Sequence, residues 1–251
     1  MTISNFNDTI TAIATPLGTG GVGVIRVSGE KALDVISKIF STSASSNKLP
    51  EFKPNYAHYG WITELKESEV SSVSVVDEVL VLYFKAPRSF TGEDVVEIHC
   101  HGGLNVVKNI LNLTIQAGAR MAQRGEFTKR AFLNGKMDLS KAEAILDLIH
   151  SQTDKFSQIS AHNLCGKLSE NINKLRQDLI DLLSQITAAI DFPEEVPEPE
   201  YDILEDKINL IIKEINRVLG TATTSNLMRQ GVKLAIAGKP NVGNHHFLML
   251  F

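Results

Sequence analysis

Up to about residue 120, short runs rich in Val and Ile alternate with turns that contain Gly, Pro or Ser. Apolar runs of this length, bounded by turn residues, predict β-strands. The predicted strands are 10–14, 22–27, 79–84 and 95–101. Helical spacing between them predicts helices at 30–40 and 104–117, the second ended by Gly118. We therefore expect a mixed α/β region at the start of the chain.

Beyond about residue 138, apolar residues recur every three or four positions, which is the period of an amphipathic helix. Ser140 and Glu143 have the spacing of a capping box at the start of the first such helix. Two longer apolar stripes follow, made of Leu175, Leu179, Leu182, Ile186 and Ile190, and of Leu204, Ile208, Ile211, Ile215 and Leu219. We expect the first helix of this pair to end at Asp191 and the second at Gly220, with an acidic connection at 193–200. The chain as a whole is predicted to be α+β, a mixed α/β domain followed by helices.

Composition narrows the class of protein only slightly. The 251 residues suffice for two small domains, and the net charge of −4 gives no general attraction to nucleic acid. Cys100 and Cys165 are too few and too far apart for a disulfide framework or a zinc cluster, so we expect two reduced, buried side chains. No segment has the pattern of a secretory signal or the length of a transmembrane helix. These features predict a cytoplasmic protein without membrane contact.

A strand-like run at 232–237 is followed by the pattern G-x-x-x-x-G of a phosphate-binding loop. The loop residues are Gly238, Lys239, Pro240, Asn241, Val242 and Gly243. The full pattern continues with Lys and then Ser or Thr, where this chain has Asn244 and His245. The groups that would contact the β/γ-phosphates and Mg²⁺ are therefore missing, and we expect no GTP hydrolysis by the chain as written.

A single-base deletion would explain how this pattern is lost. One set of codons for 244–251 encodes Lys-Ser-Ser-Leu-Leu-Asn-Ala-Leu once an A is restored after the Gly243 codon, which completes the loop. We therefore expect 244–251 to be out of frame, in a chain truncated at the start of a GTPase domain. The alternative is a genuine, divergent C-terminus.

Three segments carry candidate chemistry. The glycines of 17–23 either allow a ligand to approach the backbone before the strand that carries Arg26, or form a plain hairpin turn. Glu97, His99 and His101 share one face of a strand and suit polar ligand recognition or acid–base chemistry. A metal ion would need further ligands, and none stands at a recognisable spacing, so no metal site is predicted. Segment 124–139 mixes basic, aromatic and glycine residues, and is either an anion-binding surface or a domain junction.

Together these segments closely resemble the N-terminal part of the tRNA-modification GTPase family MnmE, also called TrmE, of bacteria and organelles. The matching motifs are DTI (8–10), AIATP (12–16), GGVGVIRVSG (20–29), SFTGEDVVE (89–97), HGG (101–103), GEFT (125–128), RAFLNGKMDL (130–139), AEAI (142–145) and AIDFPEE (189–195). The resemblance implies an N-terminal domain that dimerises and binds folate, then a helical domain into which a GTPase is inserted. It places the folate domain at 1–122, the first half of the helical domain at 123–228 and the start of a Ras-like GTPase domain at 229–251.

The resemblance also implies a function. Members of the family, with a FAD-dependent partner named MnmG, install an aminomethyl-type group on carbon 5 of the wobble uridine of certain tRNAs. The implied cofactor is 5-formyl- or methylene-tetrahydrofolate, and the intact family also uses GTP, Mg²⁺ and K⁺. Homodimerisation through the N-terminal domain, and contact with tRNA through the complex, follow from the same likeness.

The family's folate contacts fall on Arg26, Glu97 and Lys136 of this sequence. A carboxylate such as Glu97 suits the adjacent N–H donors of a pterin, and either cation suits the glutamate tail or a ring carbonyl. Two other functions fit the same residues: a stand-alone folate-binding module that regulates the full-length protein through heterodimers, and a folate-dependent one-carbon enzyme. No catalytic residue is assigned in this chain, so the sequence does not make it an enzyme by itself.

Overall fold

The computed structural model describes residues 8–45, 50–65 and 74–230, with side chains described up to residue 220. The chain forms two compact units, divided between Ala142 and Glu143. The domain boundaries expected from the sequence, after residues 122 and 228, stay predictions. The predicted phosphate-binding loop at 238–243 and the tail at 244–251 lie outside the described residues.

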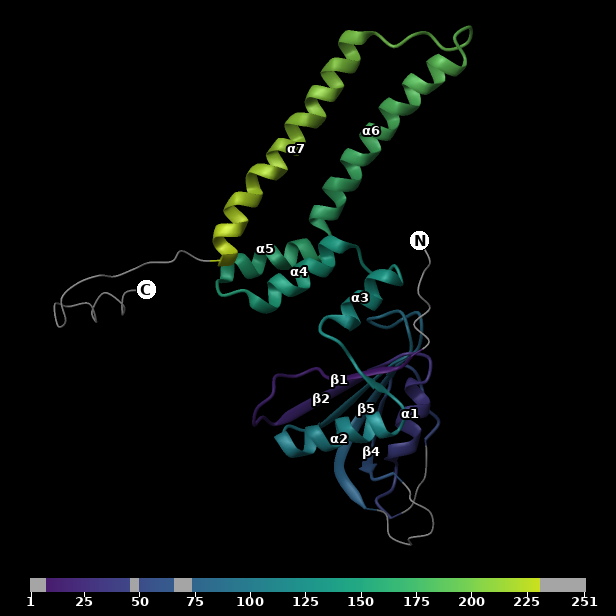
Figure 1. Ribbon diagram of the computed structural model, residues 1–251, viewed down its shortest axis with the longest axis vertical. Helices are drawn as coiled ribbons and strands as arrows, with labels where there is room; N and C mark the ends of the chain where they lie inside the picture. The colour runs from purple at the N-terminus through teal and green to yellow at the C-terminus, as the bar shows by residue number, and fades with distance from the viewer. Residues whose placement is uncertain (1–7, 46–49, 66–73, 231–251) are drawn as a thin grey trace, which may run out of the picture. The chain divides into compact units, whose positions relative to one another are not determined.

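The first unit is built on a seven-stranded sheet in the order β3-β4-β5-β6-β2-β1-β7 (Figure 1). Neighbouring strands are antiparallel, except β1 and β7, which are parallel. The strands are β1 Ile10–Ile13, β2 Val22–Ser28, β3 Phe40–Ser41, β4 Ala57–Thr63, β5 Val75–Phe84, β6 Val95–His101 and β7 Arg120–Met121. All four strands predicted from the sequence are present.

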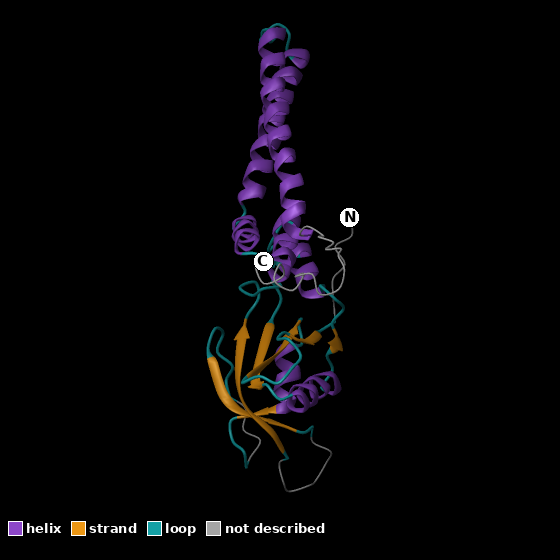
Figure 2. Cartoon of the chain, turned by 90° about the vertical axis from the view of Figure 1, so that its left-hand side faces the viewer, coloured by secondary structure: helices purple, strands orange, loops and turns teal. Residues whose placement is uncertain are grey.

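Helices α1 (Ala32–Ile39) and α2 (Leu104–Gln116) lie on one face of this sheet (Figures 1 and 2). Because side chains alternate in direction along a strand, every second residue points toward these helices. The buried strand residues of this core include Ile25, Val27, Val79, Val81, Val96 and Ile98. The residues between them, Arg26 and Glu97 among them, lie on the opposite face. Gly118 follows α2 with a φ of +117°, which confirms it as the residue that ends the helix.

Strand β4 has no clear sequence signal, because His58 and Gly60 occupy two of its inward positions. The glycine is required by close packing, since a Cβ there would lie 2.3 Å from the Ser41 carbonyl oxygen and 2.5 Å from the Phe40 ring. The His58 ring packs edge-on against Phe52. Tertiary packing, rather than strand propensity, therefore determines which residues occupy these positions of β4.

The second unit is helical. Its helices are α4 Leu139–His150, which begins at the end of the first unit, α5 Asp154–Leu164, α6 Lys167–Asp191 and α7 Tyr201–Gln230. Helices α6 and α7 run side by side, joined by the acidic connection (Figures 1 and 2). The predicted α+β class is thus confirmed. No helix in the described part of the chain is long and apolar enough to cross a membrane.

Three local predictions in this region are wrong. Asp138, not Ser140, caps α4: the Asp138 Oδ1 atom accepts a hydrogen bond from the Lys141 N–H at 2.9 Å. Helix α7 continues past Gly220 to Gln230, because a glycine inside a helix costs only about 1 kcal/mol and does not by itself end it. Cys165 is exposed rather than buried, because it follows the last residue of α5; Cys100 is buried, as expected.

Candidate functional site

Arg26 and Glu97 face each other on adjacent antiparallel strands, as register partners between β2 and β6. The Arg26 Nε atom donates to Glu97 Oε1 at 2.9 Å, and Arg26 Nη2 lies 2.7 Å from the same oxygen. The two side chains are 27% and 18% exposed, so the ion pair is only partly shielded from water. The structure thus brings together two of the three residues that the resemblance to the family assigns to folate.

Three further side chains contact this pair. The ring centroids of Phe90 and Phe127 lie 5.2 and 5.8 Å from the Arg26 Cζ atom, within the range of cation–π attraction. His99 Nε2 lies 3.3 Å from Glu97 Oε2. The site therefore offers carboxylate acceptors and guanidinium donors beside aromatic surface. This combination suits a flat heterocycle that carries N–H groups.

Lys136, the third assigned residue, contacts the loop that carries Phe90. Its Nζ atom donates to the Pro87 carbonyl oxygen at 2.9 Å. Its aliphatic stem lies against Gly92, where an added Cβ would come 3.1 Å from Lys136 Cγ. Gly92 has a φ of +80°, so this close approach and the backbone both favour glycine. Lys136 is therefore joined to the Arg26–Glu97 pair through this loop.

The face shared by Glu97, His99 and His101 is divided into two separate pairs. His101 Nδ1 lies 2.6 Å from Asp77 Oδ1, and this hydrogen bond raises the pKa of His101. Glu97 pairs with His99 instead. Among the residues that the structure describes, no group of three or more His, Cys, Asp or Glu side chains is placed to hold a metal ion.

The glycine-rich segment 17–23 lies in the hairpin connection between β1 and β2 and borders a cavity of about 290 Å³. The Gly20 N–H donates to the Gly102 carbonyl oxygen at 3.2 Å. A Cβ on Gly23 would lie 2.4 Å from Val107 Cγ2, so this glycine is required where the strand passes α2. The segment therefore forms a hairpin turn and also lines a cavity. Along β2 the lining ends at Gly23 and does not include Arg26.

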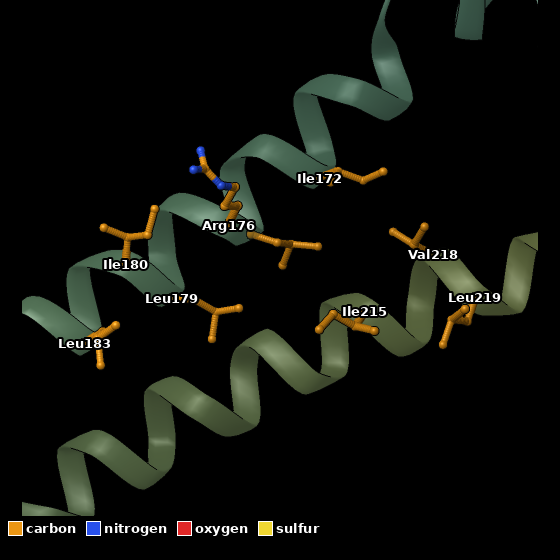
Figure 3. A pocket seen from close by; sticks show the side chains of 9 residues that line it. Ile172, Arg176, Leu179, Ile180, Leu183, Ile215, Val218 and Leu219 are labelled. Atoms are coloured by element: carbon orange, nitrogen blue, oxygen red, sulfur yellow. The ribbon is translucent and has the colours of Figure 1, made fainter. Parts of the chain in front are cut away.

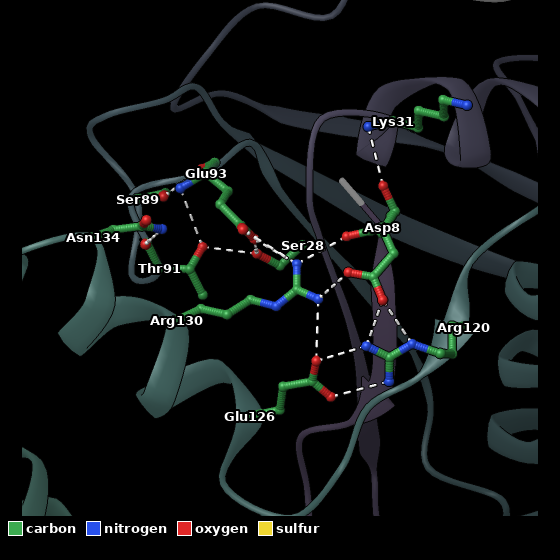
Figure 4. Close-up of polar contacts among 11 residues, drawn as sticks. Asp8, Ser28, Lys31, Ser89, Thr91, Glu93, Arg120, Glu126, Arg130 and Asn134 are labelled. Carbon is green, nitrogen blue, oxygen red and sulfur yellow. Dashed lines mark hydrogen bonds and ion pairs between the residues drawn. The ribbon is translucent and has the colours of Figure 1, made fainter. Parts of the chain in front are cut away.

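Segment 124–139 contains helix α3 (Glu126–Leu133), whose Arg130 is fully buried in a charge cluster (Figure 4). Arg130 Nη2 donates to Asp8 Oδ1 at 2.7 Å and to Glu126 Oε1 at 3.1 Å. Arg130 Nη1 donates to the Asp8 carbonyl oxygen at 2.8 Å and to Glu93 at 3.2 Å. Arg120 contacts the Asp8 and Glu126 carboxylates at 2.6 and 2.7 Å. The Arg130 side chain is therefore internal and not part of a surface that binds anions.

The two arginines keep the Asp8 and Glu126 carboxylates of this cluster ionised. Hydrogen bonds from Arg120 lower the pKa of Glu126 to about 2, although burial acts in the opposite direction. Burial also acts to raise the pKa of Asp8, but its hydrogen bonds with Arg120 and Arg130 outweigh this, and the net shift is downward. Sequence reasoning did not find the cluster. Its only local signal is the four-residue spacing of Glu126 and Arg130 on one helix.

In the second unit, α6 and α7 border an apolar groove of about 470 Å³ (Figure 3). Its lining residues are Ile172, Leu175, Arg176, Leu179, Ile180 and Leu183 of α6 and Ile215, Val218 and Leu219 of α7. Of the two predicted stripes, Leu182 and Ile211 are buried. Leu179 and Leu219 remain exposed along the groove.

Comparison with known proteins identifies the relatives of this chain. A family model described as the N-terminus of the GTP-binding protein TrmE matches residues 9–136, and a model described as the MnmE helical domain matches residues 139–245. The tRNA modification GTPase MnmE of Alkaliphilus oremlandii (strain OhILAs) is 46% identical over 243 residues. The MnmE proteins of Staphylococcus aureus strains JH9 and N315 are 42% identical over the same length.

These alignments cover most of this chain but only part of its relatives. Each spans 96% of this chain and 51% of the relative. The chain therefore spans about half the length of the curated relatives that it matches. The first family model covers the sheet of the first unit together with α3, and the second begins with α4, the first helix of the helical region.

Proposed function

Because the chain belongs to the MnmE (TrmE) family of tRNA-modification GTPases, we propose that its first unit binds a tetrahydrofolate derivative through Arg26, Glu97 and Lys136. The ligand would be 5-formyl- or methylene-tetrahydrofolate. The observation that carries this proposal is the Arg26–Glu97 pair, with two aromatic rings within 6 Å of the guanidinium. A pterin presents adjacent N–H donors to a carboxylate and a flat face to aromatic rings.

The wider role proposed for this chain follows from its relatives. In an MnmE-type enzyme the folate would take part in placing an aminomethyl-type group on the wobble uridine of tRNA, in the cytoplasm. GTP, Mg²⁺ and K⁺ belong to the GTPase part of such an enzyme. We propose homodimerisation through the first unit, and a FAD-dependent partner that acts on the same tRNA. The measured 42–46% identity supports this assignment at the level of the family.

Calorimetric titration of 5-formyltetrahydrofolate into the purified chain tests the proposal. We expect binding by the wild type and a loss of about tenfold to a hundredfold in affinity for Glu97→Ala, which leaves the ligand's N–H donors unpaired. Glu97→Gln keeps one acceptor and should bind with intermediate affinity. Absence of binding by the folded wild type would refute the proposal.

A matched control lies on the next strand. Glu78 on β5 is exposed and accepts a hydrogen bond from Tyr59, outside the Arg26 pair. Glu78→Ala removes the same charge from the same unit, so it should bind folate as the wild type does. Equal losses for Glu78→Ala and Glu97→Ala would show that net charge, rather than contact with Glu97, determines the affinity.

A further inference from the structure

The two aromatic rings that flank Arg26 come from separate segments of the first unit. Phe90 lies in the loop 85–94 between β5 and β6, and Phe127 lies in the first turn of α3. Neither ring can hold the guanidinium unless its own segment is fixed with respect to β2, the strand that carries Arg26. The cause of this fixation lies in the cluster drawn in Figure 4.

The Arg130 side chain joins the two segments. Arg130 Nη1 donates to both carboxylate oxygens of Glu93, at 3.2 and 3.3 Å, and Glu93 stands three residues after Phe90. Arg130 Nη2 donates to Glu126 Oε1, one residue before Phe127. Arg130 is fully buried and the Glu93 side chain is only 15% exposed, so water competes little with these bonds.

The same loop is also joined to the strand that carries Arg26. Ser28, two residues after Arg26 on β2, donates to Glu93 Oε2 at 2.7 Å. The Ser28 and Thr91 hydroxyls are hydrogen-bonded at 2.7 Å, and Asn134 Nδ2 donates to the Thr91 carbonyl oxygen at 2.8 Å. The loop around Phe90 is thus bonded on one side to β2 and on the other to α3 and the turn that follows it.

We propose that Glu93 and Arg130 are positioning residues for Arg26. Their ion pair fixes the loop that carries Phe90 to the helix that carries Phe127, so that both rings hold the Arg26 guanidinium against Glu97. The inference rests on the proposed function, since it concerns the same site. If the Arg26 guanidinium is already ordered, its donors and the Glu97 acceptors are in place before the ligand arrives. Binding then does not carry the entropy cost of fixing a long side chain. Loosening the ion pair should therefore weaken folate binding, although neither residue is among the three proposed to contact the ligand.

The first readout needs no ligand. Aromatic rings shift the resonance of a nearby proton, so the Nε–H of Arg26 should resonate away from exposed arginines in a ¹⁵N-labelled sample. Arg26→Lys identifies the signal by its disappearance. In Glu93→Gln, which keeps the shape of the side chain and removes its charge, we expect the signal to move toward the position of an exposed arginine. Arg130→Lys, which replaces the two-pronged guanidinium by a single amine, should move it in the same direction and serves if Glu93→Gln does not fold.

The second readout is affinity for 5-formyltetrahydrofolate, where we expect a loss of about tenfold for Glu93→Gln. Asp77→Asn is the matched control, because it removes a largely buried carboxylate that is bonded to His101 at the other end of β6. It should change neither readout.

The outcomes separate the two proposals. If the folded Glu93→Gln variant leaves the Arg26 signal where Asp77→Asn leaves it, the positioning role is refuted, whether or not folate binds. If the signal moves and the affinity does not, ordering of Arg26 has no part in binding and the inference is overturned. If the wild type does not bind folate, the proposed function fails, and with it the functional half of this inference. The Arg26 signal then still decides whether Glu93 and Arg130 order the side chain.

Discussion

Replacing Arg130 by Met should destabilise the first unit more than any single change at its surface. The guanidinium is fully buried and contacts three carboxylates, those of Asp8, Glu93 and Glu126. Met fills a similar volume but leaves these charges with less compensation. Glu93 loses its ion pair, while Asp8 and Glu126 keep Arg120. Removing one partner of a buried ionic group costs about 3–5 kcal/mol.

This cost is a large share of the total, since a domain of this size is stable by about 5–15 kcal/mol. The exposed pair of Arg217 and Glu214 supplies the comparison. Its atoms are 2.6 Å apart, but the side chains are 59% and 43% exposed. Water screens exposed pairs of this kind, so Arg217→Met, in the second unit, should leave the melting temperature of the helices nearly unchanged in circular dichroism.

Urea unfolding, followed by tryptophan fluorescence, measures the stability of the unit that contains Arg130. Trp61 is the only tryptophan of the chain and lies on β4, so its emission reports on the first unit. With a denaturant slope of about 2 kcal/mol per molar, Arg130→Met should lower the urea midpoint by about 1.5–2.5 M. A shift of less than about 0.5 M would refute the reasoning, because with this slope it corresponds to only about 1 kcal/mol, no more than an exposed ion pair contributes in general.

Two further predictions concern acid stability and the helical unit. A carboxyl whose folded pKa is lowered contributes stability above its unfolded pKa and loses it as the pH falls. Lowering of the pKa of Glu126 from 4.5 to about 2 therefore predicts that the first unit loses up to about 3 kcal/mol between about pH 4.5 and pH 2. Glu126→Gln should flatten that loss in urea titrations at each pH. On α6, Leu182→Ala should cost about 2–4 kcal/mol, whereas Leu183→Ala should cost far less, because the side chains are 7% and 63% exposed. Thermal melting followed by circular dichroism at the helical band checks this, and equal melting temperatures would contradict it.

The sheet around Arg26 was predictable because it depends on a local period. Alternation along 95–101 places Glu97, His99 and His101 opposite Val96, Ile98 and Cys100, and on 22–28 Arg26 lies opposite Ile25 and Val27. What the alternation cannot supply is the register. A shift of one residue between β2 and β6 would pair Arg26 with a core position instead. The contact of Arg26 with Glu97 therefore had to come from the structure, or from the likeness to the family.

The charge cluster was not predictable from the pattern, for a different physical reason. Arg130 is separated from Glu93 by 37 residues and from Asp8 by 122, and no periodicity links positions so far apart. A basic residue in a polar segment is usually solvated, so its burial contradicts the ordinary expectation. At Gly220 a local signal gave a wrong prediction instead. The glycine indicated the end of a helix, but α7 continues to Gln230.

The pairing of Glu97 with Arg26 does not close the site to a ligand. An ionised carboxylate has about four acceptor positions on its two oxygens. Arg26 Nε and Nη2 both contact Oε1, and His99 lies at 3.3 Å from Oε2. One acceptor position therefore remains, on Oε2, for an N–H group of a ligand, without displacement of Arg26. A ligand that binds in this way adds a hydrogen bond to an assembled ion pair, so Arg26 contributes both by its own donors and by holding the Glu97 carboxylate in place.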